Sequence, residues 1–161
     1  MNNLLNKLST QLIDKKLKLI TVESCTGGWI SKLITDRAGS SDWFECGIIT
    51  YSNEAKQKLV NVDSNLLEKY GAVSRQVAHA MAQGASQLFS DCISLSVTGI
   101  AGPSGGSEAK PVGLVYLSVA FKNNSKTIKC DFSGSRDKIR SSAINQGLNL
   151  VSEFLDQPTN T

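Results

Sequence analysis

The first apolar pattern along the chain has helical spacing. Leucine and isoleucine recur every three or four residues near the N-terminus, which predicts a packing helix. The helix is expected to end at Lys15 and Lys16, where cations suit a helix C-terminus. Its apolar face would consist of Leu4, Leu5, Leu8, Leu12 and Ile13.

Short runs rich in β-branched residues predict the strands. Three of them occupy 17–22, 46–51 and 93–97, and the second is expected to be a buried strand. Two later runs, 112–121 and 127–132, predict an antiparallel hairpin added to the sheet.

Helical patterns separate these strands, and several begin at residues that commonly cap helices. The first three expected helices run from the segment 23–28 to Gly39, over 53–60 after a Ser52 cap, and from Asp63 to Gly71. The fourth follows a Ser74 cap, and its expected buried stripe consists of Val77, Met81, Ala85, Leu88 and Phe89. The last begins at about Ser135, and its expected inward-facing residues are Ile139, Ala143, Leu148, Val151 and Leu155.

The alternation of helices and strands, followed by a hairpin, predicts the fold class: a three-layer α/β/α domain with a mixed sheet. With 161 residues the chain is expected to form one domain over 1–156, followed by a flexible polar tail over 157–161. The strand order does not follow from these patterns.

The segment 97–113 departs from both patterns. It holds five glycines, two prolines and three hydroxyl side chains between two apolar runs. Glycine allows positive φ and a close approach of the backbone to a ligand, and free N–H and hydroxyl groups can bind a phosphate or an oxyanion. The spacing matches neither a P-loop nor a Rossmann turn. We interpret the segment as the floor of a pocket; a surface turn between strands is the alternative.

A second candidate anion site is the strand-to-helix turn 23–28, with the sequence ESCTGG. Such a turn presents free N–H groups, which suit anion binding and would also lower the pKa of Cys25. The alternative is that Ser24 or Thr26 only caps the helix.

Two arginines, Arg136 and Arg140, lie one turn apart near the start of the last helix. They are expected either to bind a phosphate or to form a solvated basic face.

Composition narrows the chemistry. Four scattered cysteines and a single histidine, His79, indicate neither a zinc cluster nor a disulfide framework, so no metal or other cofactor is expected. A net charge of +3 with dispersed lysines does not indicate nucleic-acid binding. The N-terminus lacks the apolar core of a signal peptide, and no run is long enough for a membrane span. A cytoplasmic protein without a nucleic-acid or membrane partner is expected.

A hydrolase of this composition must activate a hydroxyl or thiol with a base other than histidine. Lys56 is the candidate, because burial can depress the pKa of a lysine. Ser40 and Ser41 precede the strand 46–51, and Tyr51 ends it. The S-x-x-K with K-T-G arrangement is not found around Lys56, and no G-x-S-x-G elbow occurs, which excludes two well-known serine hydrolase classes.

Several motifs occur in order along the chain: ESCTGG at 23–28, GSS at 39–41, YSNEAK at 51–56, GAVS at 71–74, TGIAGP at 98–103 and KPVG at 110–113. Together they closely resemble the CinA C-terminal domain family, over nearly the whole chain. The resemblance implies a stand-alone nicotinamide-nucleotide amidase of the PncC type, which hydrolyses the small molecule nicotinamide mononucleotide to nicotinate mononucleotide and ammonia in pyridine nucleotide recycling. We also expect a homo-oligomer.

The resemblance also implies roles for individual residues. The implied catalytic residues are Ser41 as nucleophile, Lys56 as base, Tyr51 as the hydroxyl partner of the base, and Thr98 beside the reacting group. The implied substrate-binding residues are Ser24, Thr26, Gly27, Gly28, Asn53, Gly99, Ala101, Gly102, Gly105, Gly106, Arg136 and Arg140.

The residues by themselves do not choose Ser41 over Ser40, Ser24 or Cys25 as nucleophile. Two other functions therefore stay open. One is a thiol hydrolase that uses Cys25, although the sequence shows no base near it. The other is a binding module that holds a pyridine nucleotide and reports it to a protein partner, although the intact Ser41 and Lys56 argue against it.

Overall fold

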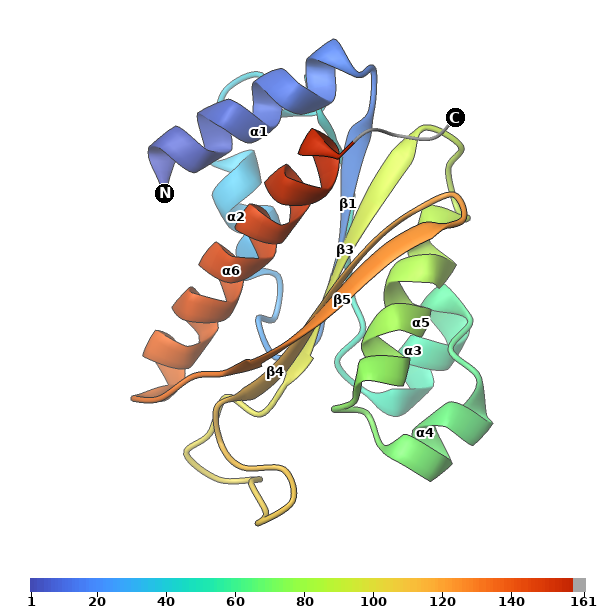
Figure 1. Ribbon diagram of the computed structural model, residues 1–161, viewed down its shortest axis with the longest axis vertical. Helices are drawn as coiled ribbons and strands as arrows, with labels where there is room; N and C mark the ends of the chain where they lie inside the picture. The colour runs from blue at the N-terminus through green and yellow to red at the C-terminus, as the bar shows by residue number, and fades with distance from the viewer. Residues whose placement is uncertain (158–161) are drawn as a thin grey trace.

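The computed structural model describes residues 1–157 and is built on a five-stranded mixed sheet in the order β2-β1-β3-β4-β5 (Figure 1). Strands β2 and β3 run parallel to β1, β4 runs antiparallel to β3, and β5 runs antiparallel to β4. The carboxyl ends of β1, β2 and β3 therefore lie side by side at one end of the sheet. The strands are β1 (Lys18–Glu23), β2 (Phe44–Ile49), β3 (Cys92–Gly99), β4 (Leu114–Phe121) and β5 (Asn124–Asp131).

Helices cover both faces of the sheet, so the predicted three-layer α/β/α architecture is confirmed (Figure 1). One face carries α1 (Asn2–Asp14), α2 (Trp29–Thr35) and α6 (Arg136–Asp156). The other carries α3 (Asn53–Val60), α4 (Ser64–Tyr70) and α5 (Arg75–Ser86), and a short 3-10 helix, η1, spans Ser40–Asp42.

The helix starts follow the local sequence. The side chains of Ser52, Asp63, Ser74 and Ser135 each accept a backbone N–H from the first turn of the helix that follows. Each of these bonds satisfies a donor that has no partner inside its helix. The predicted starts of α3, α4, α5 and α6 are thus confirmed.

The central strand β3 lies between two apolar clusters, one under α1, α2 and α6 and one under α3, α4 and α5. Its two buried serines face α5, where the Ser94 and Ser96 hydroxyls donate to the carbonyls of Ala82 and Ala78, each at 2.6 Å. These bonds satisfy polar groups that would otherwise be costly to bury.

Three expectations about burial are wrong. Strand β2 is an edge strand whose alternate residues are exposed, so Ile49 keeps half of its surface in solvent. Helix α5 ends at Ser86, and Leu88 and Phe89 lie beyond it on the surface. Ile13 is exposed as well, because the buried residues of α1 are Leu5, Leu8 and Leu12.

His79 is exposed on α5. The part of the chain that the structure describes contains no helix that is both long enough and apolar enough to cross a membrane. The predicted tail lies outside the described residues from 158 onward.

Candidate active site

A cavity of about 280 Å³ opens at the carboxyl ends of β1, β2 and β3. Ligands in α/β sheets commonly bind at this end of the sheet. The lining residues come from the segments that follow each strand, from the α4–α5 connection and from the start of α6: Ser24, Cys25, Tyr51, Lys56, Ala72, Val73, Thr98 to Gly102, Ser104, Gly105 and Arg136.

Lys56 is the most deeply buried charged side chain of the cavity, with only 1 % of its surface exposed. It lies in the first turn of α3, and its Nζ reaches back to the carbonyl oxygens of Thr50 at 2.7 Å and Tyr51 at 3.5 Å. Its third partner is the Ser24 hydroxyl, at 3.1 Å. Desolvation lowers the pKa of Lys56 below its ordinary value of 10.5.

This geometry suits proton abstraction. A neutral lysine amine has two N–H donors and one lone pair. The two backbone carbonyls can accept both N–H bonds, which leaves the lone pair for the Ser24 O–H. A neutral Lys56 could therefore accept the Ser24 proton across this contact.

The turn after β1 is held by the buried carboxylate of Glu23, which has no solvent exposure. The carboxylate accepts the N–H groups of Gly28, Ile30 and Ser31 at 2.9 to 3.0 Å, and the Ser31 hydroxyl at 2.7 Å. The expectation that the start of α2 offers free N–H groups to an anion is therefore wrong, because Glu23 already occupies them. Neither Ser24 nor Thr26 caps the helix.

Cys25 does not have the lowered pKa expected for a thiol at a helix start. Helix α2 begins only at Trp29, and Cys25 is buried, with 8 % of its surface exposed. Desolvation raises the pKa of this thiol to about 11. Cys25 is thus a neutral thiol in the cavity wall near neutral pH.

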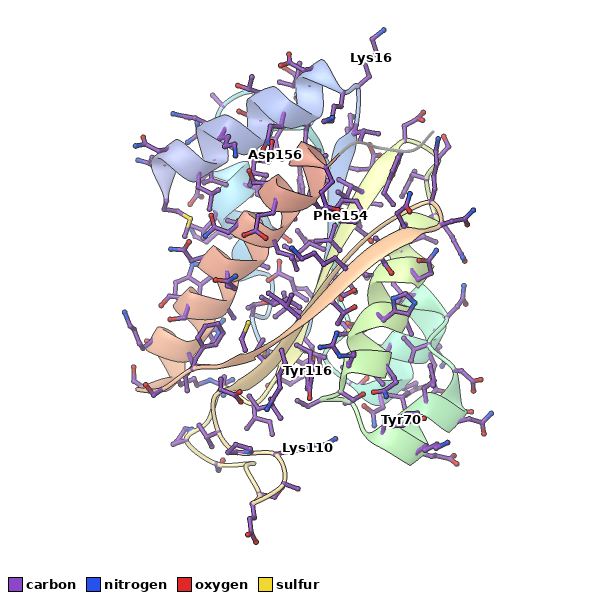
Figure 2. The ribbon with its side chains drawn as sticks, viewed as in Figure 1. Lys16, Tyr70, Lys110, Tyr116, Phe154 and Asp156 are labelled. Carbon is purple, nitrogen blue, oxygen red and sulfur yellow. The ribbon has the colours of Figure 1, made fainter. Side chains whose placement is uncertain are left out.

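The glycine-rich segment forms the floor of the cavity and is pinned at several points. Gly113 has a φ of 97°, and a Cβ there would collide with the carbonyl of Phe132. The Thr98 hydroxyl donates to the carbonyl of Ala72 at 2.9 Å, and Lys110 Nζ donates to the carbonyl of Tyr70 at 2.5 Å. Figure 2 shows Lys110 on this loop and Tyr70 near the end of α4. The floor is therefore tied to the α4–α5 connection.

Backbone orientation distinguishes the N–H groups of the floor. Val97 accepts the N–H of Ser24 at 3.0 Å, so the backbone groups of Val97 face β1. Gly99 lies two residues further, beyond the last β1–β3 pair, so strand alternation directs its N–H to the β1 side of β3 as well. The N–H of Ile100 instead donates to Leu114 on β4. The Gly99 N–H is therefore a candidate donor for an oxyanion.

The two arginines of α6 have different environments. Arg136 lines the cavity, and its Nη1 donates to the carbonyl of Gly102 at 2.7 Å. Arg140 Nη2 donates to the carbonyl of Thr26 at 2.7 Å, and its guanidinium lies 5.0 Å from the centre of the Trp29 ring. Arg140 lines a second hollow of about 430 Å³ with Gly27, Gly28, Trp29, Lys32 and Asp137.

The structure brings most of the predicted site residues together. The cavity collects Ser24, Tyr51, Lys56, Thr98, Gly99, Ala101, Gly102, Gly105 and Arg136, whereas Thr26, Gly27, Gly28, Asn53, Gly106 and Arg140 do not line it.

Two predicted catalytic residues are not placed as expected. Ser41 lies in η1, before β2, whereas Lys56 follows β2, and the six residues of that strand span roughly 20 Å at about 3.3 Å per residue. The chain therefore does not bring Ser41 to Lys56. Tyr51 bonds Lys56 through its carbonyl rather than its phenol, and 65 % of Tyr51 is exposed.

Sequence reasoning missed Ala72, Val73 and Ile100 as cavity residues. The motif at 71–74 was the available signal for the first two. Within residues 1–157, no three His, Cys, Asp or Glu side chains lie close enough to hold a metal ion.

Comparison with known proteins identifies relatives over most of the chain. The family model described as the CinA C-terminal domain matches residues 1–155. A putative competence-damage inducible protein from Caldicellulosiruptor bescii is 52% identical over 141 residues, which make up 87% of this chain and 34% of the relative. A CinA-like protein from Geobacter sulfurreducens is 52% identical over 127 residues, covering 79% of this chain and 31% of the relative. The chain spans about a third of the length of these relatives.

Solved structures share the fold over almost the whole chain. The competence/damage inducible protein CihA from Agrobacterium tumefaciens superposes with a TM-score of 0.91 at 38% identity, covering 96% of this chain and 94% of that one. The competence damage-inducible protein A from Klebsiella pneumoniae gives a TM-score of 0.92 at 29% identity, with 98% of both chains covered.

Proposed function

Because the chain belongs to the CinA C-terminal domain family, we propose that it is an amidase that hydrolyses nicotinamide mononucleotide to nicotinate mononucleotide and ammonia. The observation that carries this proposal is the 3.1 Å contact between the buried Lys56 amine and the Ser24 hydroxyl in the cavity. Lysine and serine in this relation can cleave an amide without a metal-bound water.

The proposed reaction begins when Ser24 Oγ attacks the carboxamide carbon and Lys56 takes the Ser24 proton. The Gly99 N–H holds the oxygen that becomes negative. The Lys56 ammonium then protonates the leaving nitrogen, so ammonia departs and the nicotinoyl group stays on Ser24 as an ester. A water molecule, deprotonated by Lys56, hydrolyses the ester and restores Ser24.

We expect the purified protein to release ammonia from nicotinamide mononucleotide and to keep this activity in EDTA, because the proposed base is an amine. A coupled ammonia assay with and without EDTA measures both. Loss of activity in EDTA that zinc restores would contradict the lysine mechanism. Binding of the mononucleotide by calorimetry without ammonia release would instead support a binding module that acts through a protein partner.

The phosphate of the substrate is expected to contribute to binding through Arg136, which lines the cavity and has donors beyond the one bonded to Gly102. Nicotinamide riboside should therefore show a kcat/KM lower by roughly ten- to a hundredfold, as is typical for loss of a charge-assisted hydrogen bond. Arg136→Gln should weaken turnover of the mononucleotide by a similar factor and leave turnover of the riboside nearly unchanged.

The matched control is Arg37→Gln, because Arg37 bonds Asn6 on α1, outside the cavity lining. Equal turnover of riboside and mononucleotide by the wild-type protein would show that Arg136 serves another purpose.

A further inference from the structure

The turn that carries Ser24 is held from two directions. At its start, the Glu23 carboxylate takes the N–H groups of Gly28, Ile30 and Ser31. These bonds fix where the turn enters α2. The carbonyl of Thr26 accepts the backbone N–H of Trp29 at 3.2 Å and also faces α6.

Arg140 restrains that carbonyl. Its Nη2 donates to Thr26 at 2.7 Å, and the guanidinium packs over the Trp29 ring at 5.0 Å. A planar group held between a ring and a carbonyl has little freedom to rotate. Asp137 is only a distant partner, because its carboxylate lies 3.9 Å from Arg140 Nη1 and is largely exposed.

Helix α6 also bonds the glycine-rich floor of the cavity. Arg136, one turn earlier on α6, donates to the carbonyl of Gly102 in the glycine-rich floor. Two neighbouring arginines of one 21-residue helix are thus bonded to the two backbone segments between which a substrate must fit. Together with the Ser24 N–H bond to Val97, these two arginine bonds help to set the spacing between the Ser24 turn and the floor.

We propose that Arg140 is a positioning residue: it holds the turn of residues 24–28 so that the Ser24 hydroxyl meets the Lys56 amine. It does not line the cavity; it bonds the Thr26 carbonyl, lies beside Gly27, and packs on the Trp29 ring at the start of α2. This role differs from binding the phosphate, which the sequence had equally suggested for Arg140. This proposal rests on the proposed function where it is tested by kcat, but not where it is tested by chemical labelling of Ser24.

The test compares Arg140→Gln with Arg75→Gln. Arg75 is a matched control, because its Nη1 also donates to a carbonyl, that of Thr127 on β5, away from the cavity. In Arg140→Gln, kcat for nicotinamide mononucleotide should fall by roughly ten- to a hundredfold, as expected for a misplaced nucleophile, while KM stays within about threefold. Arg75→Gln should match the wild type in both constants.

The chemical readout is the rate at which diisopropyl fluorophosphate labels Ser24, measured by peptide mass. In this reaction the Ser24 oxygen bonds to phosphorus, fluoride leaves, and Lys56 takes the proton. Labelling of Arg140→Gln should slow by about the same factor as kcat, and labelling of Arg75→Gln should not. If Arg140→Gln does not fold, Arg140→Lys carries the test, and its labelling should still slow by at least about threefold because lysine lacks the flat group that packs on Trp29.

The outcomes separate the two proposals. A wild-type protein that labels at Ser24 but releases no ammonia would contradict the amidase function and leave the labelling comparison to decide the role of Arg140. Wild-type labelling rates in the Arg140 variants, a rise in KM alone, or no labelling of Ser24 in the wild type would each overturn the positioning role.

Discussion

Ser24→Ala is expected to lower kcat for nicotinamide mononucleotide on the order of 10⁴-fold or more, the size of loss seen when a catalytic nucleophile is removed. The physical reason is the position of the Ser24 hydroxyl in the cavity, 3.1 Å from the Lys56 amine. The measurement is steady-state ammonia release, with calorimetry to show that the variant still binds the mononucleotide.

Two other side chains serve as controls for the choice of nucleophile. Ser41→Ala should keep most of the activity, because β2 separates Ser41 from Lys56. Cys25→Ala should also keep most of it, because burial raises the pKa of this thiol to about 11 and leaves almost no thiolate near neutral pH. An inactive Ser41→Ala beside an active Ser24→Ala would restore the nucleophile that the family resemblance implies. An inactive Cys25→Ala beside an active Ser24→Ala would favour a thiol mechanism.

Lys56→Arg is expected to be nearly as inactive as Lys56→Ala, with a loss of about 10²- to 10⁴-fold in kcat. Arginine keeps the positive charge, but its pKa above about 12 prevents it from accepting a proton near neutral pH. Both variants should still bind the mononucleotide by calorimetry. Near-normal turnover by Lys56→Arg would mean that Lys56 acts only through its charge.

The pH dependence provides a second check on Lys56. The amine is a base only when neutral, so the wild-type rate should rise with pH as the ammonium loses its proton. Because burial lowers the pKa of Lys56, this rise should occur below the ordinary lysine value of 10.5. The same rise should be missing from the residual activity of Lys56→Ala.

The free energy of unfolding should also depend on the lowered pKa of Lys56. Between the folded and unfolded pKa values the native protein binds fewer protons than the unfolded chain, so the free energy of unfolding rises with pH in this window. Lys56→Met keeps an unbranched side chain of similar length but loses this contribution. Wild-type protein should therefore gain stability relative to Lys56→Met as the pH rises toward 10.5, as measured by urea unfolding at several pH values.

The fold and one part of the site could be predicted from sequence because they depend on local interactions. Helix starts at Ser52, Asp63 and Ser74 follow from a side chain bonding a backbone group two or three residues later. The strands and the hairpin follow from short runs rich in β-branched residues. Lys56 could be chosen because it comes just after a strand, where its side chain reaches the carboxyl edge of the sheet.

The order of residues also contained the information that separates Ser41 from the other candidates. Ser41 precedes β2 and Lys56 follows it. The length of this strand therefore keeps the two residues at opposite ends of the sheet, Ser41 at the amino end of β2 and Lys56 at its carboxyl end. Ser24 and Lys56 lie much further apart in sequence, but each follows a strand. Because β1 and β2 are parallel neighbours, these two positions meet.

Other features were decided only by the tertiary structure. The helix start of α2 looks like an anion site until Glu23 is seen to occupy it. Arg136 and Arg140 are equivalent by helical spacing, yet one faces the glycine-rich floor and the other the Thr26 carbonyl. The pKa of Cys25 depends on how many neighbours cover it, which no local motif records. In each case the outcome depends on which distant segments pack against the residue, because long-range contacts determine which donors are occupied and which charges are desolvated.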